Sequence, residues 1–278
     1  MSAVLPHLRS GAGRLTVRRV EGASAVVVSE ATDPLKLLVT APRGPCVWAY
    51  TTTYGGGLLA GDEIDFAVRV EAGARLYLGS QASTKIYRSP DGVVTRQRVR
   101  LQVDDDALAV VLPDPVTPFA EAVHEQDQEL TLAAGASLLW CDGVTSGRAA
   151  RDERWSCTRH RTRLRLLVAG RLRLREGLDL SAGLSRPLVE RMAAVGAMTT
   201  LLVGGPLFTD LAAALLADNA ARPLPGANAP LITAAPIAGW GAVVRIAAAQ
   251  RETLDRTVRG LLGDLRPLLA DDPWQRRP

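Results

Sequence analysis

The chain has 278 residues, of which 47% are hydrophobic and 22% charged, so it can bury a sizeable core in one large domain or two small ones. Its 33 basic and 29 acidic residues leave a net charge of +4, which is too small to indicate nucleic-acid binding by itself. The three cysteines have no C-x-x-C spacing, and their odd number argues against a disulfide framework. No apolar run reaches the roughly 18 residues of a membrane span. With no apolar signal-peptide segment at the N-terminus, these features predict a cytoplasmic protein.

The N-terminal part of the chain predicts short strands. Residues 15–20 and 25–30 predict a hairpin that turns at Glu21-Gly22-Ala23. Two further strands are expected over residues 35–40 and 47–53, immediately before a glycine run.

That glycine run consists of Gly55, Gly56 and Gly57. Three glycines in succession cost backbone entropy, so they predict a place that needs positive φ or a very close backbone approach. The next glycine, Gly61, is followed by Asp62 and a predicted strand, whereas a P-loop requires a lysine and a helix there. A tight turn beside a packed sheet edge is therefore the prediction. Hydrogen-bonding side chains crowd a segment further on, at Gln81, Ser83, Thr84, Lys85, Tyr87, Arg88 and Ser89.

Strands then recur about every ten residues, over 63–71, 74–80, 93–103, 107–112, 129–133 and 136–141. The first of them alternates Ile64, Phe66, Val68 and Val70 with polar residues, which is typical of a half-buried strand. Regular short strands with Gly and Asp turns predict a layered all-β structure, either a sandwich or a β-helix-like stack. No internal sequence repeat distinguishes the two.

Three predicted strands carry rows of arginines, and period two places each row on one face of its strand. Like charges side by side destabilise a sheet, so these rows need nearby anions or free water. The chain offers an acidic row of its own at Glu125, Asp127 and Glu129. A solvated face of mixed charge and a docking face for an acidic partner both fit. The arginine rows are Arg96, Arg98 and Arg100; Arg159, Arg161, Arg163 and Arg165; and Arg171, Arg173 and Arg175.

After Ser185 the pattern becomes mixed. Strands are predicted over 197–203, 231–235 and 240–248, and a helix over 206–221. A second, amphipathic helix is predicted over 252–269, with Pro267 bending it or ending it early. The sequence therefore predicts a β-rich main body over 1–185, an α+β part over 186–270 packed on it, and a polar tail over 271–278.

Metal-binding patterns are sparse. His7, His124 and His160 are the only histidines, and none has the paired His or Cys spacing of a structural zinc site. His124 lies in a charged run that predicts exposure, and His160 lies between two arginines. All three are expected to be surface or packing residues.

Four carboxylates, Asp62, Asp114, Asp142 and Glu153, stand beside Gly or Pro or close to them, at predicted strand ends. From its position, each is expected to be a turn carboxylate that bonds its own backbone. A pair such as Asp62 and Glu153 on a β-helical scaffold leaves a hydrolase as an alternative. The aromatic content of 4% counts against a sugar-binding platform.

Four long motifs, in this order, resemble the urease accessory protein UreD family, called UreH in some organisms. The resemblance extends from about residue 30 to residue 180, and Asp33-Pro-Leu-Lys-Leu-Leu38 also fits it. The motifs are Tyr54-Gly-Gly-Gly-Leu-Leu-Ala-Gly-Asp62; Gln81-Ala-Ser-Thr-Lys85-Ile-Tyr87-Arg88-Ser89; Leu112-Pro-Asp-Pro-Val-Thr-Pro-Phe-Ala120; and Asp142-Gly with Gly147-Arg148-Ala-Ala-Arg-Asp-Glu153-Arg-Trp155.

This resemblance implies a mainly β fold, a two-layer, β-helix-like stack of strands with a smaller α+β part and two C-terminal helices. It implies a non-enzymatic scaffold and metallochaperone that binds apo-urease and the UreF-like and UreG-like accessory proteins, with no nucleic-acid or membrane partner. Nickel is expected only in transit, with no tightly bound cofactor, and the C-terminal helix is expected to face the UreF-like partner.

The same resemblance assigns expected roles to residues. Asp62, Glu153 and Asp142 are expected to contact nickel on its path, and the segment 81–89 to form a rigid polar lining. The remaining motif residues are expected to hold the structure together: Gly55, Gly56, Gly57, Gly61, Gln81, Lys85, Tyr87, Arg88, Asp114 and Arg148.

Overall fold

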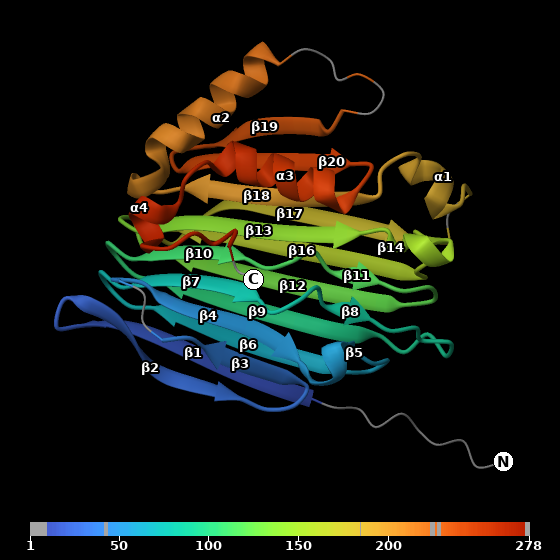
Figure 1. Cartoon of the computed structure of the whole chain (residues 1–278), viewed down its shortest axis with the longest axis horizontal. Helices are drawn as coiled ribbons and strands as arrows, with labels where there is room; N and C mark the ends of the chain where they lie inside the picture. The colour runs from blue at the N-terminus through green and yellow to red at the C-terminus, as the bar shows by residue number, and fades with distance from the viewer. Residues whose placement is uncertain (1–9, 42–43, 184, 223–225, 227–228, 276–278) are drawn as a thin grey trace.

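The computed structural model describes residues 10–41, 44–183, 185–222, 226 and 229–275, and its strands form two large sheets in two layers (Figure 1). The seven-stranded sheet has the spatial order β17 (Arg171–Ser181), β16 (Arg159–Val168), β12 (Val123–Leu132), β9 (Thr95–Val103), β6 (Glu63–Val70), β1 (Ser10–Val20) and β2 (Ala23–Ala31). The eight-stranded sheet has the order β19 (Leu231–Ile237), β20 (Gly241–Ala248), β18 (Ala197–Gly204), β13 (Ser137–Thr145), β10 (Leu108–Leu112), β7 (Arg75–Ser80), β4 (Val47–Thr53) and β3 (Leu35–Val39).

The chain coils between these sheets as a β-solenoid of about four turns. Each of the first three coils passes from a strand of the eight-stranded sheet, through a two-residue strand, to a strand of the seven-stranded sheet. The two-residue strands β5 (Gly57–Leu58), β8 (Lys85–Ile86) and β11 (Thr117–Pro118) pair in parallel as a short third side. The fourth coil crosses at the hairpin of β14 (Gly147–Arg148) and β15 (Glu153–Arg154). The expected β-helix-like stack is thus confirmed.

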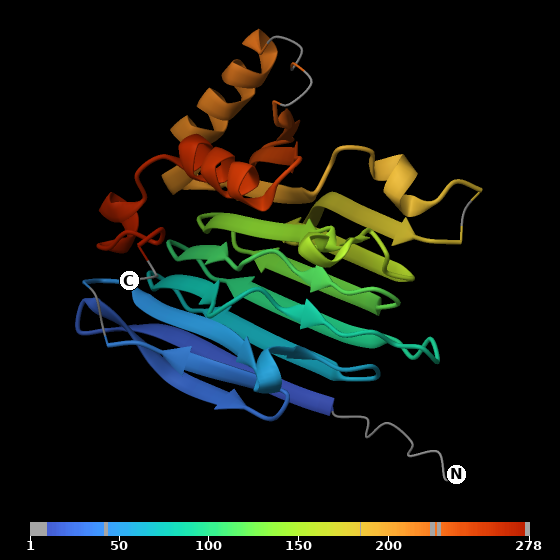
Figure 2. The ribbon, with the colours of Figure 1, turned by 45° about the vertical axis from the view of Figure 1, so that its right-hand side comes forward.

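Apolar side chains fill the space between the two sheets, and a second core lies on the outer face of the eight-stranded sheet. Helices α2 (Thr209–Ala221), α3 (Arg251–Leu262) and α4 (Arg266–Leu269) cover that outer face, as Figure 2 shows. Leu254, Val258 and Leu262 of α3 are buried against it because they recur every four residues. The remaining helical segments are α1 (Leu188–Met192) and three 3₁₀ turns, η1 (Tyr54–Gly56), η2 (Ala149–Arg151) and η3 (Pro206–Phe208).

The outer face of the seven-stranded sheet carries charges in alternating rows. The acidic row of β12 lies between the arginine rows of β9 and β16, in register. Asp127 accepts two hydrogen bonds from Arg163, at 2.6 and 2.9 Å, and Glu125 pairs with Arg161 at 2.8 Å. The acidic row therefore forms ion pairs with the arginines of β16, whereas the arginines of β9 pair with Glu63 and Asp65 of β6. A docking face for an acidic partner is not needed to explain these two arginine rows.

Most predicted strands are confirmed, and the differences have clear physical causes. The strand expected at 129–133 begins at Val123, because polar residues at its inward positions hide the alternation. The helix expected over 252–269 ends at Leu262, where Gly263 has φ 63°, so α4 is separate. The division of the chain at residue 185 stays a prediction, although β18 and β20 continue the large sheet. The predicted tail 271–278 is described only as far as Gln275. Among the described residues, no helix has the length and apolarity needed to cross a membrane.

Candidate functional site

The glycine run that opens the third side meets both conditions predicted for it. Gly55 and Gly56 have φ of 74° and 73°, the left-handed region that favours glycine. Gly57 is extended, but a Cβ there would lie 2.6 Å from the carbonyl oxygen of Lys85 and 2.6 Å from Cε2 of Tyr87. The run therefore lets β5 lie directly against β8.

Motif residues from successive coils stack along this third side. The hydroxyl of Tyr87 donates to the carbonyl of Gly55 at 3.4 Å, and its ring meets Phe119 edge-on at 5.3 Å between centroids. The guanidinium of Arg148 lies 4.2 Å from the Phe119 ring centroid and forms a bidentate pair with Glu153. Glu153 also accepts from the backbone N–H of Ala120 at 3.4 Å. Motifs that are far apart in the sequence thus form one continuous ridge.

At the start of this ridge is a corner that we call the lysine corner, formed by Lys36, Tyr54, Leu59, Lys85 and Arg88. Tyr54 is 58% exposed and Leu59 55% exposed. Lys36 Nζ lies 4.5 Å from the centre of the Tyr54 ring, and Lys85 extends toward Gly56. None of the three basic side chains pairs with a carboxylate in the described part of the chain. Both lysines of the protein therefore lie at one exposed, partly apolar, basic corner.

Inside the solenoid, polar side chains interrupt the apolar core over three coils. We call this set the polar strip. It comprises Gln97 of β9; His124, Gln126 and Gln128 of β12; and His160 and Thr162 of β16. Strand register aligns them across the sheet: Gln97 pairs with Gln126 and Gln126 with Thr162, while His124 pairs with His160. The prediction that His124 is exposed is wrong, since both histidines are buried. The period-two alternation of β12 points these polar residues inward and the charged row outward.

Asp142 of β13 faces this strip from the opposite sheet. It lines two cavities. The larger, of about 230 Å³, reaches the edge strands β17 and β19. The smaller, of about 110 Å³, is also lined by Thr84, Gln97 and Gln126. Its Oδ1 accepts from Nε2 of Gln126 at 3.5 Å. Burial raises the pKa of Asp142 to about 6, and the polar side chains of Gln128 and Thr162 nearby oppose the rise. A carboxylate therefore stands between two cavities inside the protein.

The other predicted path carboxylates lie elsewhere. Asp62 is buried and accepts from the backbone N–H of Leu59 at 2.8 Å, so it forms a turn. Glu153 is in the ridge, and its bond with Arg148 lowers its pKa. Asp114 pairs with Arg251 of α3 at 2.9 Å, which ties the helical layer to the sheet, and it also lines the smaller cavity. The structure does not bring Asp62, Glu153 and Asp142 into one described cavity.

The segment 81–89 divides between two roles. Thr84 lines the smaller interior cavity, whereas Gln81, Lys85 and Arg88 are exposed. Ser83 donates to the carbonyl of Pro115 at 2.5 Å, which fastens one coil to the next. Of the segment expected to form a rigid polar lining, only Thr84 lines either of these two cavities, and four residues of the polar strip line them as well. Sequence reasoning missed the strip, although the alternation of β12 was a signal for it.

No three His, Cys, Asp or Glu residues in the described ranges lie close enough to hold a metal ion. The three cysteines are free and buried, and burial raises the pKa of Cys141 to about 12. Its thiol is therefore protonated and a poor metal ligand. The donors that line the two described cavities are amide oxygens, hydroxyls, imidazole and the carboxylates of Asp142, Asp114 and Glu176. Such a set suits a dication that is held weakly.

Fold and site together define a β-solenoid protein with a ridge of stacked motifs outside and a polar strip inside. A family profile described as UreD urease accessory protein matches residues 9–278. A relative named urease accessory protein UreD from an Anaeromyxobacter species is 41% identical over 271 residues, covering 98% of this chain and 91% of the relative. One of the same name from Sorangium cellulosum is 41% identical over 272 residues, covering 97% and 85%. A rice protein (Oryza sativa subsp. indica) named urease accessory protein D is 27% identical over 299 residues, covering 98% of both. The chain belongs to the UreD family of urease accessory proteins.

Proposed function

We propose that this protein acts without catalysis of its own in urease maturation, binding apo-urease and other accessory proteins and passing Ni²⁺ through its interior. The observation that carries the proposal is the position of Asp142, a carboxylate that lines two cavities and faces a strip of polar side chains within an apolar core. Buried polar groups are costly unless they are satisfied, so a strip of this length argues for a use beyond packing.

The donor chemistry of the strip suits Ni²⁺ in transit. Oε1 of Gln126 is a buried acceptor without a hydrogen-bond donor in the described part of the chain, and Asp142 supplies the negative charge. Imidazole suits nickel, whereas oxygen ligands bind it more weakly than a thiolate cage would. A partly hydrated ion that meets such donors one or two at a time is released again. That is the behaviour a carrier requires.

The partner-binding part of the proposal rests on the lysine corner. Its exposed Tyr54 and Leu59, surrounded by basic side chains, match a partner surface that is apolar at its centre and acidic at its rim. We assign this corner to contact with the urease apoprotein or with a UreF-like or UreG-like accessory protein. An amine-reactive cross-linker tests this directly, because Lys36 and Lys85 carry the only side-chain amines. Cross-links to a partner at these lysines support the assignment, and full reactivity of both lysines within the assembled complex contradicts it.

The hydrolase alternative has little support in the geometry. A general acid needs a raised pKa and a position beside the scissile bond. Arg148 instead lowers the pKa of Glu153, and Asp62 is buried in a turn. The two carboxylates line no common cavity in the described residues.

Co-expression with urease and its other accessory proteins tests the nickel path. We expect Asp142→Asn to lower the nickel content and specific activity of the purified urease, while the complex still forms. Asp65→Asn is the matched control, because Asp65 lies on the outer face and binds Arg98 and Arg100 there. Unchanged nickel loading in the Asp142 variant would overturn the interior path. Full loading in cells that lack this protein would overturn the accessory role.

A further inference from the structure

The two buried histidines form a directed hydrogen-bond chain. Nδ1 of His124 lies 3.1 Å from Nδ1 of His160, and Nε2 of His124 lies 3.0 Å from Oε1 of Gln97. His124 is fully buried and His160 is 1% exposed. The hydrogen-bond partners of the two rings are each other and an amide, and no described carboxylate bonds to either ring, so a buried positive charge here would be uncompensated and both rings are neutral.

The neutral state of both rings and the amide oxygen of Gln97 together determine which ring nitrogens of His124 and His160 carry a proton. Oε1 of Gln97 only accepts, so Nε2 of His124 must carry its ring proton, and Nδ1 of His124 is then an acceptor. The donor in the contact between the rings is therefore Nδ1–H of His160. A neutral imidazole has one proton, so Nε2 of His160 carries a bare lone pair. No described residue donates to it.

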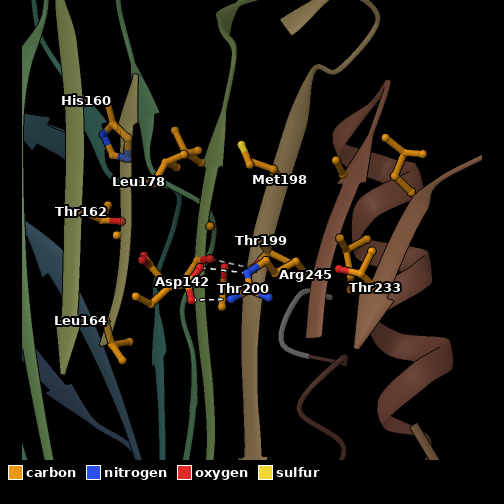
Figure 3. Close-up of a pocket in the computed structure, with 17 residues that line it drawn as sticks. Asp142, His160, Thr162, Leu164, Leu178, Met198, Thr199, Thr200, Thr233 and Arg245 are labelled. Carbon is orange, nitrogen blue, oxygen red and sulfur yellow. Dashed lines mark hydrogen bonds and ion pairs between the residues drawn. The ribbon is translucent and has the colours of Figure 1, made fainter. Parts of the chain in front are cut away.

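That lone pair belongs to a side chain in the wall of the larger cavity. His160, Thr162 and Asp142 all line this space, as Figure 3 shows. Thr162 follows His160 on the same face of β16, roughly 6.5 Å along the strand. Thr162 lies close enough to the carboxylate of Asp142 to lower its pKa. A cation on the imidazole would therefore have the carboxylate within reach of its bound water.

We propose that Nε2 of His160, with the carboxylate of Asp142 reached through water, is a binding site for a borderline divalent cation such as Ni²⁺. Gln97 and His124 are positioning residues, because they hold His160 in the one tautomer whose Nε2 is free. This site deepens the nickel path and rests on the proposed function for the identity of its cargo.

The arrangement matches how proteins prepare a histidine ligand. A metal-bound imidazole donates its other ring N–H to a second group that fixes the tautomer and the ring orientation. Here that second group is His124, which Gln97 fixes in turn. A single direct protein ligand leaves most coordination positions to water. The site therefore holds an ion briefly, and Mg²⁺, which prefers oxygen ligands, is not expected to compete.

Cobalt(II) and Ni²⁺ binding by the full-length chain test the site, measured by visible absorption and by equilibrium dialysis in an excess of Mg²⁺. His160→Gln should weaken binding at least tenfold, and Gln97→Leu should weaken it several-fold although Gln97 is not a ligand. Gln97→Glu should restore it, because a carboxylate also only accepts. Nitrogen-15 spectra of labelled histidine should show an unprotonated Nε2 on His160 in the wild type and a protonated one in Gln97→Leu. Asp65→Asn is the unaffected control.

The outcomes separate this site from the wider proposal. Wild-type affinity in His160→Gln, or an unprotonated Nε2 in Gln97→Leu, overturns the histidine site. If urease nickel still falls in Asp142→Asn in that event, the interior path stands without His160. Weakened cobalt binding in both the His160 and Gln97 variants, with rescue by Gln97→Glu, supports the site, because a merely structural role would not follow the identity of the hydrogen-bond acceptor.

Discussion

The close approach at Gly57 provides a stability test with an internal control. Replacing Gly57 by Ala places a Cβ 2.6 Å from the carbonyl oxygen of Lys85 and 2.6 Å from the ring of Tyr87, where ordinary contacts are 3.4–4 Å. The backbone of Gly57 is extended, which any residue adopts, so the whole effect is steric. β5 and β8 must move apart by close to an ångström, and the Tyr87 ring must shift from Phe119. Overpacking of this kind costs about 1–3 kcal/mol of unfolding free energy.

The matched control is Gly260→Ala in α3. A Cβ at Gly260 has no neighbour within 4 Å, and alanine in a helix interior stabilises by about 1 kcal/mol relative to glycine. Urea unfolding followed by the fluorescence of the five tryptophans measures both variants. The same substitution should therefore shift the midpoint in opposite directions. A Gly57→Ala midpoint equal to that of the wild type would refute the argument that close packing requires this glycine.

Three further predictions concern the polar strip and the ridge. Burial lowers the pKa of His160 to about 4, so the stability that comes from its neutral form is fully present above pH 6.5 and is lost as the pH falls through 4, by about 3 kcal/mol of unfolding free energy. His160→Gln should therefore flatten the plot of unfolding free energy against pH between these values. An unchanged slope in this variant would contradict the low pKa of His160. Because the pKa of Asp142 is raised to about 6, the stability associated with its neutral form is present below pH 3.8 and is lost as the pH rises through 6. In urea titrations, Asp142→Asn should match the wild type at pH 3.5 and be more stable by about 3 kcal/mol at pH 7. Equal stability of the two proteins at both pH values would count against a partly desolvated carboxylate. Arg148→Lys keeps the positive charge but loses the bidentate pair with Glu153 and the planar contact with the Phe119 ring, so the thermal unfolding midpoint should fall. A midpoint equal to that of the wild type would show that the positive charge alone is enough to stabilise the ridge.

The sequence predicted the features whose physical cause is local. The run Gly55–Gly57 indicated positive φ or close contact, and both occur. The acidic row of β12 indicated a partner for the arginines, and strand register places it between them. The alternation of apolar residues in β6 indicated a half-buried strand, which is what that strand is.

The features that were missed depend on contacts between distant coils. The solenoid has no sequence repeat because its coils are joined by backbone hydrogen bonds, which any side chain permits. His124 was predicted to be exposed because its chain neighbours are charged, and only the pairing of β12 with β16 buries it. The two-residue strands β5 and β8 are too short for any periodicity to reveal them. Asp142 was named as a candidate from its motif, but its place between two cavities depends on the packing of opposite sheets.

The parallel ladders also constrain how the chain can acquire its structure. Glu63 pairs with Arg96, 33 positions later in the chain, and Val123 pairs with Arg159, 36 positions later. The backbone hydrogen bonds between these parallel strands therefore cannot form until the next complete coil has been synthesised. Such distant pairings fold slowly, and until they form each finished coil presents an unpaired apolar edge. During synthesis, the unpaired edge of the most recently formed coil is therefore the part of this protein most prone to aggregation. It remains exposed until the following strands and the helices that cover them have been synthesised.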